Sequence, residues 1–157
     1  MNRSLFKVAC ILTLVFFVMS TTGAAATTAS SGKVVQITQP SQINSALSKG
    51  PIFLRLGASW CSHCKAFEPT LQTLAKKYSG KVTFMSGDIT KSPKLITYFG
   101  IRVIPDCCVI VGIQNGKYIY MQQNGKTTTV RANARITGDK SISVYEIILN
   151  YAIKYKK

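Results

Sequence analysis

Acidic residues are scarce in this chain. Only 5 of its 157 residues are Asp or Glu, against 20 Lys and Arg, which gives a formal net charge of +15. Such a surface attracts anionic partners rather than cationic ones. The lysines are scattered instead of clustered with aromatic side chains, so no nucleic-acid interface is expected. We interpret the charge as a solvated basic surface, suited to anionic envelope polymers or acidic client proteins.

A hydrophobic run long enough to cross a membrane is also missing near the N-terminus. The apolar stretch VACILTLVFFVM, residues 8–19, is short for a membrane span but long enough for the core of a signal peptide. Two basic residues precede it, and a small-residue tract with an A-x-A pattern follows. We predict a signal peptide at residues 1–26, a linker at 27–33 and one domain at 34–157. The alternative is an uncleaved signal anchor.

This order of segments predicts an extracytoplasmic protein, secreted or held in the cell envelope, with no stable membrane insertion after cleavage. Cys10 lies inside the apolar stretch and would be removed with it. Four cysteines would remain, and an exported protein permits disulfides between them.

Histidine and tryptophan occur once each, and both accompany the same pair of cysteines. Trp60, Cys61, His63 and Cys64 all fall within GASWCSHCKAFEP, residues 57–69. A buried strand is predicted just before this stretch and a helix from the cysteines onward. The first cysteine would then meet free backbone N–H groups and the positive end of the helix dipole, which stabilise a thiolate. This placement makes Cys61 the candidate nucleophile and Cys64 the candidate resolving thiol.

The two other side chains of this stretch have predicted roles as well. A protonated His63 would stabilise the Cys61 thiolate further and make the disulfide a stronger oxidant. Trp60 is expected to shield one side of the site and to contact the client.

Two other uses of the cysteine pair stay open beside redox exchange. A structural disulfide is possible, although so short a loop gains little from closure. A zinc site would need four ligands and would have to recruit Cys107 and Cys108, which are adjacent on a predicted strand and would point to opposite faces. We therefore expect no metal and interpret Cys107 and Cys108 as inert core residues. The alternative for these two is a second redox pair or an additional resolving thiol.

The predicted elements alternate between strands and helices and then change to hairpins. The stretch QNGK occurs at residues 114–117 and again at 123–126, and Asn-Gly is a strong hairpin signal, so three antiparallel strands are expected. The third strand should carry one packed face and one basic, solvated face with Arg131 and Arg135. The full order of expected elements is strand 33–37, a helix capped by Ser41, strand 51–58, a helix from the cysteines to about 78, strand 81–89, helix 92–100, strand 107–113, two hairpin strands and helix 141–155. The last helix is expected to bury an apolar stripe made of Val144, Ile147, Ile148, Tyr151 and Tyr155.

The sequence resembles the thioredoxin superfamily at several motifs with the right spacing between them. WCSHCK is similar to the redox motif, Pro69 matches the proline that kinks the following helix, and YFGIRVIPD, residues 98–106, is similar to the stretch that ends in a cis-proline. The resemblance implies an α/β thioredoxin fold, a mixed sheet flanked by helices, here with an extended C-terminal hairpin region. It also implies a cis peptide at Ile104–Pro105, facing the cysteines, whose backbone pairs with a client.

The chain departs from this family beneath the expected site. Arg55 aligns with the family's buried acidic residue, and Ser86 aligns with the lysine that usually partners that acid. An arginine cannot act as a base, so its charge would stabilise thiolate, unless the side chain reaches out to the surface. A histidine at the position of His63 resembles protein disulfide isomerases and periplasmic oxidants, whereas an isoleucine before the proline, as at Ile104, resembles thioredoxins. The direction of electron flow therefore stays open.

These observations predict an exported, monomeric thiol-disulfide oxidoreductase that needs no cofactor. It would exchange disulfides with protein thiols and disulfides and depend on a further redox partner for recycling. The alternatives are a non-catalytic thioredoxin-fold module that docks a partner through its basic hairpin, and a thiol-based metal-handling protein.

Overall fold

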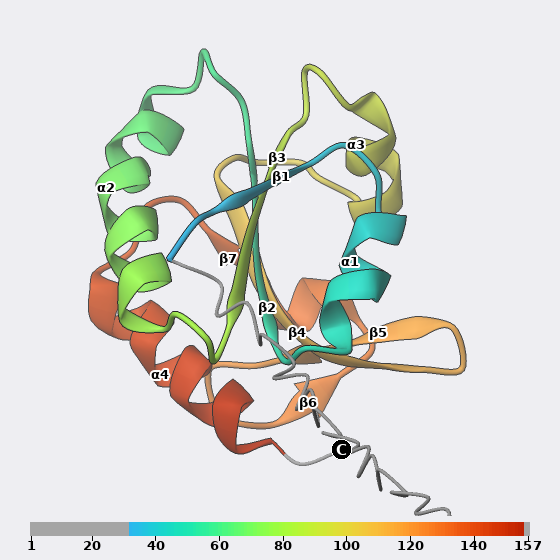
Figure 1. Cartoon of the computed structure of the whole chain (residues 1–157). Coiled ribbons are helices and arrows are strands. Elements are labelled where there is room, and N and C mark those ends of the chain that lie inside the picture. Colours follow the sequence, from blue (N-terminus) through green and yellow to red (C-terminus); the bar gives the residue numbers. More distant parts are fainter. Residues whose placement is uncertain (1–31, 156–157) are drawn as a thin grey trace, which may run out of the picture.

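The computed structural model describes residues 32–155. The predicted signal peptide and most of the predicted linker lie outside the described residues. A twisted sheet runs through the molecule and helices cover both of its faces (Figure 1). In chain order the elements are β1 (Val35–Ile37), α1 (Ser41–Leu47), β2 (Ile52–Gly57), α2 (Ser62–Lys77), β3 (Thr83–Asp88), α3 (Pro93–Phe99), β4 (Asp106–Gln114), β5 (Lys117–Met121), β6 (Thr127–Thr128), the 3-10 helix η1 (Arg131–Ala134), β7 (Ile136–Thr137) and α4 (Ile142–Lys154).

The sheet is mixed, as the sequence predicted. Its strand order is β1-β3-β2-β4-β5-β6, and β7 pairs with the start of β4 on the edge opposite β2. The first three strands are parallel, and β4 runs antiparallel to β2. Strand β2 is central and buried on both faces, which explains its unbroken apolar sequence except at Arg55.

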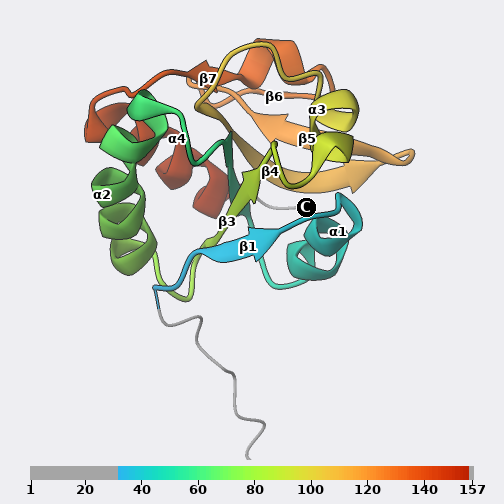
Figure 2. The same ribbon diagram turned by 90° about the horizontal axis from the view of Figure 1, so that it is seen from above.

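Each face of the sheet has its own core. Helices α2 and α4 pack on one face and α1 and α3 on the other (Figures 1 and 2). On the α2 and α4 side, the ring centroids of Phe53 and Phe84 are 5.2 Å apart and those of Phe67 and Tyr145 are 4.9 Å apart. Among the residues that the structure describes, no helix has the length and apolarity needed to cross a membrane.

The first Asn-Gly turn forms the predicted hairpin between β4 and β5. Gln114 pairs with Lys117, so Asn115 and Gly116 alone make the turn, and both have positive φ, 51° and 74°. A two-residue turn that matches the strand twist requires positive φ at both positions, which Asn and Gly tolerate.

The prediction of a long third strand with a basic, solvated face is wrong. Strand β6 covers only two residues, and the 3-10 helix η1 and the short β7 replace the rest. The Arg131 side chain is only 8% exposed, and Arg135 is also turned inward. Both bind the carboxylate of Asp106, which is fully buried and needs a counter-charge. This non-local pairing overrides the alternating pattern of the sequence.

The predicted buried stripe of the C-terminal helix is only partly right, since Ile148 is buried as predicted. The side chains that α4 buries are Tyr145, Ile148, Leu149 and Ala152. Two of the predicted residues, Ile147 and Tyr151, are instead exposed. The helix is rotated by about one residue, roughly 100°, relative to the prediction. This rotation brings Tyr145 into the aromatic core and its hydroxyl to the carbonyl of Gly138.

Two helix starts differ from the predictions in a smaller way. Ser41 is the first residue of α1, and Pro40 takes the N-cap position without a side-chain hydrogen bond. Helix α3 begins with Pro93 and ends at Gly100 in the left-handed conformation, as expected, but the Ser92 side chain forms no capping hydrogen bond.

Candidate redox site

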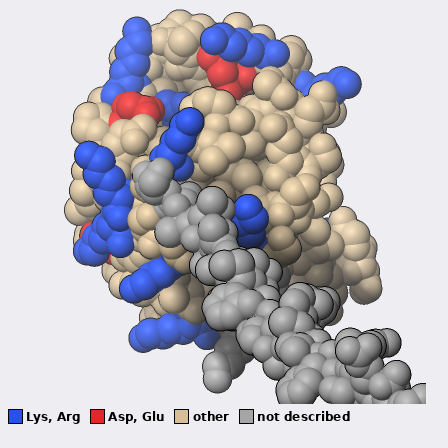
Figure 3. Space-filling view, in the orientation of Figure 1, with Lys and Arg blue, Asp and Glu red and all other residues tan. Residues whose placement is uncertain are grey.

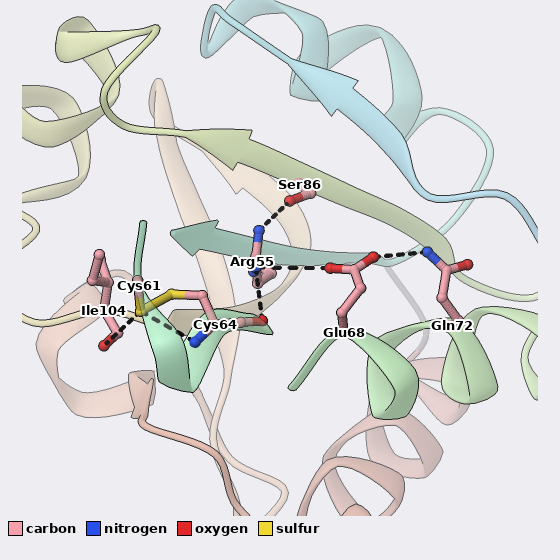
Figure 4. A network of polar contacts seen from close by, with 7 residues as sticks. All are labelled: Arg55, Cys61, Cys64, Glu68, Gln72, Ser86 and Ile104. Carbon is pink, nitrogen blue, oxygen red and sulfur yellow. Dashed lines mark hydrogen bonds and ion pairs between the residues drawn. A yellow bond between two sulfur atoms is a disulfide. The ribbon is translucent and has the colours of Figure 1, made fainter. Parts of the chain in front are cut away.

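Cys61 and Cys64 form a disulfide at the N-terminus of α2 (Figure 4). Strand β2 ends at Gly57, a tight turn follows, and Cys61 occupies the N-cap position of the helix. The backbone N–H of Cys64 donates a hydrogen bond of 3.1 Å to Cys61 Sγ. The sulfur of Cys61 therefore takes the position of an N-cap acceptor, at the positive end of the helix dipole.

The two sulfurs differ in depth. Cys64 is completely buried, whereas Cys61 keeps a small exposed edge. An external thiol or disulfide therefore meets Cys61 first.

The loop before β4 faces the disulfide from the other side. The Ile104–Pro105 peptide bond is cis, and the carbonyl oxygen of Ile104 lies 3.9 Å from Cys61 Sγ. Gly138, from the segment before α4, donates its N–H to the carbonyl of Pro105 at 2.9 Å. Backbone groups rather than charged side chains thus flank the more exposed sulfur on this side.

Arg55 lies beneath the disulfide and does not extend to the surface. Its side chain is 12% exposed. Nη1 donates to Ser86 Oγ at 3.0 Å, and Nη2 donates to the carbonyl oxygen of Cys64 at 3.1 Å (Figure 4). The carboxylate of Glu68 is 3.7 Å from Nη2, and Gln72 donates to the same carboxylate.

An open pocket of about 410 Å³ adjoins this arrangement. Arg55, Cys64, Lys65 and Glu68 are among the residues that line it. The pocket therefore reaches both the Arg55–Glu68 ion pair and the residue that forms the buried half of the disulfide.

The two unique aromatic residues of the motif lie on the surface. Trp60 is 67% exposed, and its Nε1 donates to Thr90 Oγ1 at 3.1 Å. The His63 side chain is 72% exposed, and its Nδ1 is 3.6 Å from a carboxylate oxygen of Asp139. Both side chains can therefore contact a macromolecule that approaches the disulfide.

Cys107 and Cys108 are free thiols buried in the two opposite cores. Burial raises the pKa of Cys107 well above its ordinary value, and it raises the pKa of Cys108 as well. Neither thiol forms a disulfide, and their side chains point to opposite faces of the sheet, as predicted. Within residues 32–155, no group of three His, Cys, Asp or Glu side chains is arranged to hold a metal ion.

Residues 33–135 match the model of the Thioredoxin family. The chain belongs to the thioredoxin family. It is 32% identical over 83 residues to a thioredoxin of Haemophilus influenzae, a match that covers 53% of this chain and 75% of that protein. It is also 32% identical over 80 residues to the chloroplastic thioredoxin M2 of Arabidopsis thaliana, covering 50% of this chain and 43% of that protein. The match thus spans less than half the length of this chloroplastic relative.

Solved structures agree with the thioredoxin fold. A mutant thioredoxin from Halobacterium salinarum superposes with a TM-score of 0.60 at 16% identity, covering 80% of this chain and 96% of that one. Thioredoxin f from spinach chloroplast gives a TM-score of 0.57 at 24% identity, covering 78% of this chain and 96% of that one. The predicted fold class is therefore confirmed.

Sequence reasoning missed two charged residues of the site. Glu68 follows Cys64 by four residues on α2, so helical spacing already places both on one face of the helix. Asp139 reaches His63 from the segment before α4, and no local pattern in the sequence marks it.

Proposed function

We propose that this thioredoxin-family chain is an extracytoplasmic thiol-disulfide oxidoreductase that exchanges disulfides with protein clients. The observation that carries the proposal is the position of Cys61. Its sulfur is the N-cap acceptor of α2, is disulfide-bonded to Cys64 and keeps an exposed edge. A thiolate at such a helix end is stabilised by backbone N–H groups and the dipole, and the thiolate is the reactive form of cysteine.

The exchange proceeds through a mixed disulfide. The Cys61 thiolate attacks one sulfur of a client disulfide, and the other client sulfur leaves as a thiolate that takes up a proton. Cys64 then loses its proton and attacks Cys61 Sγ, which breaks the mixed disulfide and releases the second client thiol. The client gains two electrons and the protein becomes the disulfide. In the opposite direction, the same steps oxidise a client dithiol.

The surface around Cys61 suits an extended client segment. We assign client binding to the backbone at Ile104 and Pro105, which can pair with an added strand. The exposed ring of Trp60 supplies apolar contact on the other side of the disulfide. We assign thiolate tuning to His63, which carries positive charge near Cys61 when protonated.

The proposed location rests on the sequence of residues 1–26. The protein would act there as a monomer, and a separate electron-transfer partner would recycle it. Mass spectrometry of the mature protein tests the location: loss of residues 1–26 is expected, and detection of residues 1–20 in the mature chain would contradict signal cleavage.

The alternative role, binding a partner through a basic hairpin, lacks the exposed arginines that it requires. That hairpin was expected to present Arg131 and Arg135 to a partner, but both side chains bind Asp106 inside the molecule.

Insulin reduction by the full chain in the presence of dithiothreitol tests the activity. The unmodified protein should accelerate precipitation of the insulin chains, and Cys61→Ser should abolish the effect. In a separate reaction without dithiothreitol, pre-reduced Cys64→Ser should accumulate a client joined to Cys61, visible as a band that disappears on reduction. Full biological function in a variant without both thiols would favour a binding role and reject the oxidoreductase.

A further inference from the structure

The fixed positive charge beneath the disulfide has a chemical consequence for the buried cysteine. We propose that Arg55 stabilises Cys64 as a thiolate when the disulfide opens, and so makes Cys64 a good leaving group and the site more oxidising. The proposal rests on the proposed function, because it assigns a role to a residue of the same redox pair. Arg55 acts through Cys64 and is a positioning residue rather than a catalytic one.

The guanidinium lies close to the Cys64 sulfur. Gly57 separates the two, and a Cβ on this glycine would lie 2.9 Å from Cys64 Sγ and 3.0 Å from Arg55 Cζ. Sγ and Cζ can therefore be no more than about 6 Å apart. An opposite charge at about 4–6 Å typically lowers the pKa of an acid by about 1–3 units.

The guanidinium is also held in this position. Ser86 and the carbonyl of Cys64 accept hydrogen bonds from its two terminal nitrogens. Its Nε is buried and makes no hydrogen bond to protein atoms. The charge is thus oriented by fixed partners, and one donor remains without an acceptor.

Only one carboxylate forms an ion pair with Arg55 in the described part of the chain. Glu68 approaches from the pocket side at 3.7 Å and is about half-exposed, so solvent weakens its effect on the guanidinium. The positive charge beneath Cys64 is therefore only partly neutralised.

This charge acts on a definite step of disulfide exchange. An external thiolate attacks Cys61 Sγ and forms a new S–S bond, the Cys61–Cys64 bond breaks, and its electron pair goes to Cys64 Sγ. Arg55 beneath it stabilises the thiolate that forms on this sulfur. A second external thiolate attacks the external sulfur of the mixed disulfide, releases Cys61, and leaves the external reductant oxidised to its disulfide.

The forward and reverse rates of this step change in opposite senses, and both changes favour the opened form. A more acidic leaving thiol leaves faster, and a more stable thiolate attacks more slowly. Arg55 should therefore accelerate opening of the disulfide and slow resolution of the mixed disulfide by Cys64.

Titration of the Cys64 thiolate tests the proposal without any client. Cys61→Ser leaves Cys64 as the only thiol of the site, and Cys107 and Cys108 do not interfere because burial raises the pKa of both. The ultraviolet absorbance of the thiolate is followed against pH. Adding Arg55→Gln should move the midpoint upward by about one pH unit or more. Lys76→Gln removes the same charge from the exposed far end of α2 and should leave the midpoint unchanged.

A second variant should shift the Cys64 titration midpoint in the opposite direction. It changes a half-exposed residue, so the fold should tolerate it. Glu68→Gln removes the carboxylate that partly neutralises Arg55, so the midpoint should move downward. If Arg55→Gln fails to fold, Arg55→Lys replaces it and should move the midpoint by less than one unit in the same upward direction. A midpoint that stays fixed in a folded Arg55 variant, or a Glu68→Gln midpoint that does not fall, would overturn the proposal.

The redox equilibrium with glutathione provides an independent measurement on the intact cysteine pair. Arg55→Gln should lower the equilibrium constant for reduction of the protein disulfide by about tenfold, which corresponds to about 30 mV for two electrons. An unchanged constant would contradict the proposal. A protein that titrates as expected but never reduces insulin would instead contradict the proposed function, so the two failures are distinguishable.

Discussion

Four cysteines of the described domain show how strongly position controls one side chain. Cys61 caps the N-terminus of α2 and its sulfur accepts a backbone N–H, whereas Cys107 lies in the core on a central strand. The thiolate is the reactive form of cysteine, and burial in apolar surroundings disfavours it. Reactivity should therefore differ between these thiols by far more than their accessibility alone suggests.

Alkylation of the native, reduced protein tests this difference. Cys61 should be fully labelled before the first sample is taken by manual mixing near neutral pH, while Cys107 and Cys108 stay unlabelled. The sign follows from the raised pKa of the two buried thiols, because raising the pH should be required before their thiolates form. Peptide mapping by mass spectrometry identifies the labelled residue. Denatured protein, in which all of these thiols should react, is the control, and fast native labelling of Cys108 would mark it as a further redox residue.

The segment from β6 to β7 holds the loop between α3 and β4, which carries Ile104 and Pro105. Arg131 holds both oxygens of Asp106, at 2.6 and 3.2 Å, and also donates to the carbonyl of Phe99. Arg135 adds a contact of 3.1 Å to Asp106 and donates to the carbonyl of Gly100. These bonds connect both ends of the loop between α3 and β4 to the segment from β6 to β7.

Loss of the central carboxylate should release this loop. Asp106→Asn leaves two inward-turned guanidinium groups without a counter-charge, and breaking a buried pair in this way typically costs about 3–5 kcal/mol. Chemical denaturation should show a loss of that size, and hydrogen exchange should become faster at residues 100–104. Asp139→Asn removes an exposed carboxylate from a nearby segment and should cost less than about 1 kcal/mol. Equal stability of both variants would show that the buried network contributes little.

The elements that sequence predicted well are those specified by local patterns. The hairpin turn at Asn115 needs only two residues with positive φ, and the redox helix needs a strand, a turn and a capping position close together in the chain. The burial of Arg131 depends on Asp106, which lies 25 residues earlier, so no local pattern announces it. The position of Arg55 beneath the site followed from resemblance, but its partner Glu68 required the observed orientation of α2.

The buried face of helix α4 could not be predicted from the sequence for a different reason. Its sequence is apolar enough that two neighbouring stripes satisfy a helical period, and packing against the aromatic core selects one of them. The choice is testable with two truncations. Leu149→Ala removes a fully buried side chain and should cost about 2–5 kcal/mol of unfolding free energy. Ile147→Ala, at a position that is 51% exposed, should cost about 0.5 kcal/mol or less. A larger loss for Ile147 would support the predicted stripe after all.

Positive charge dominates the surface of the molecule because its few carboxylates already have partners within the chain. Glu68, Asp106, Asp139 and Glu146 each pair with a basic or histidine side chain, and Asp88 accepts the backbone N–H of Thr90. Lys and Arg side chains lie mainly along the left half and the top of the face seen in Figure 3, with only small acidic patches between them. The excess of Lys and Arg in the described part of the chain therefore acts as a positive field at its surface.

This field should select clients by charge before any contact at Cys61. Two disulfide-linked peptides of equal length, one rich in Asp and Glu and the other rich in Lys and Arg, provide the comparison. At low ionic strength the acidic peptide should oxidise the reduced protein about tenfold faster or more, since steering raises association rates on this scale. The advantage should shrink as salt rises, because the Debye length falls to about 8 Å at 0.15 M and to about 3 Å at 1 M. Reaction of each peptide with dithiothreitol, which carries no charged surface, controls for intrinsic reactivity. Rates that are equal for both peptides at low salt would mean that the basic surface serves solvation and not client choice.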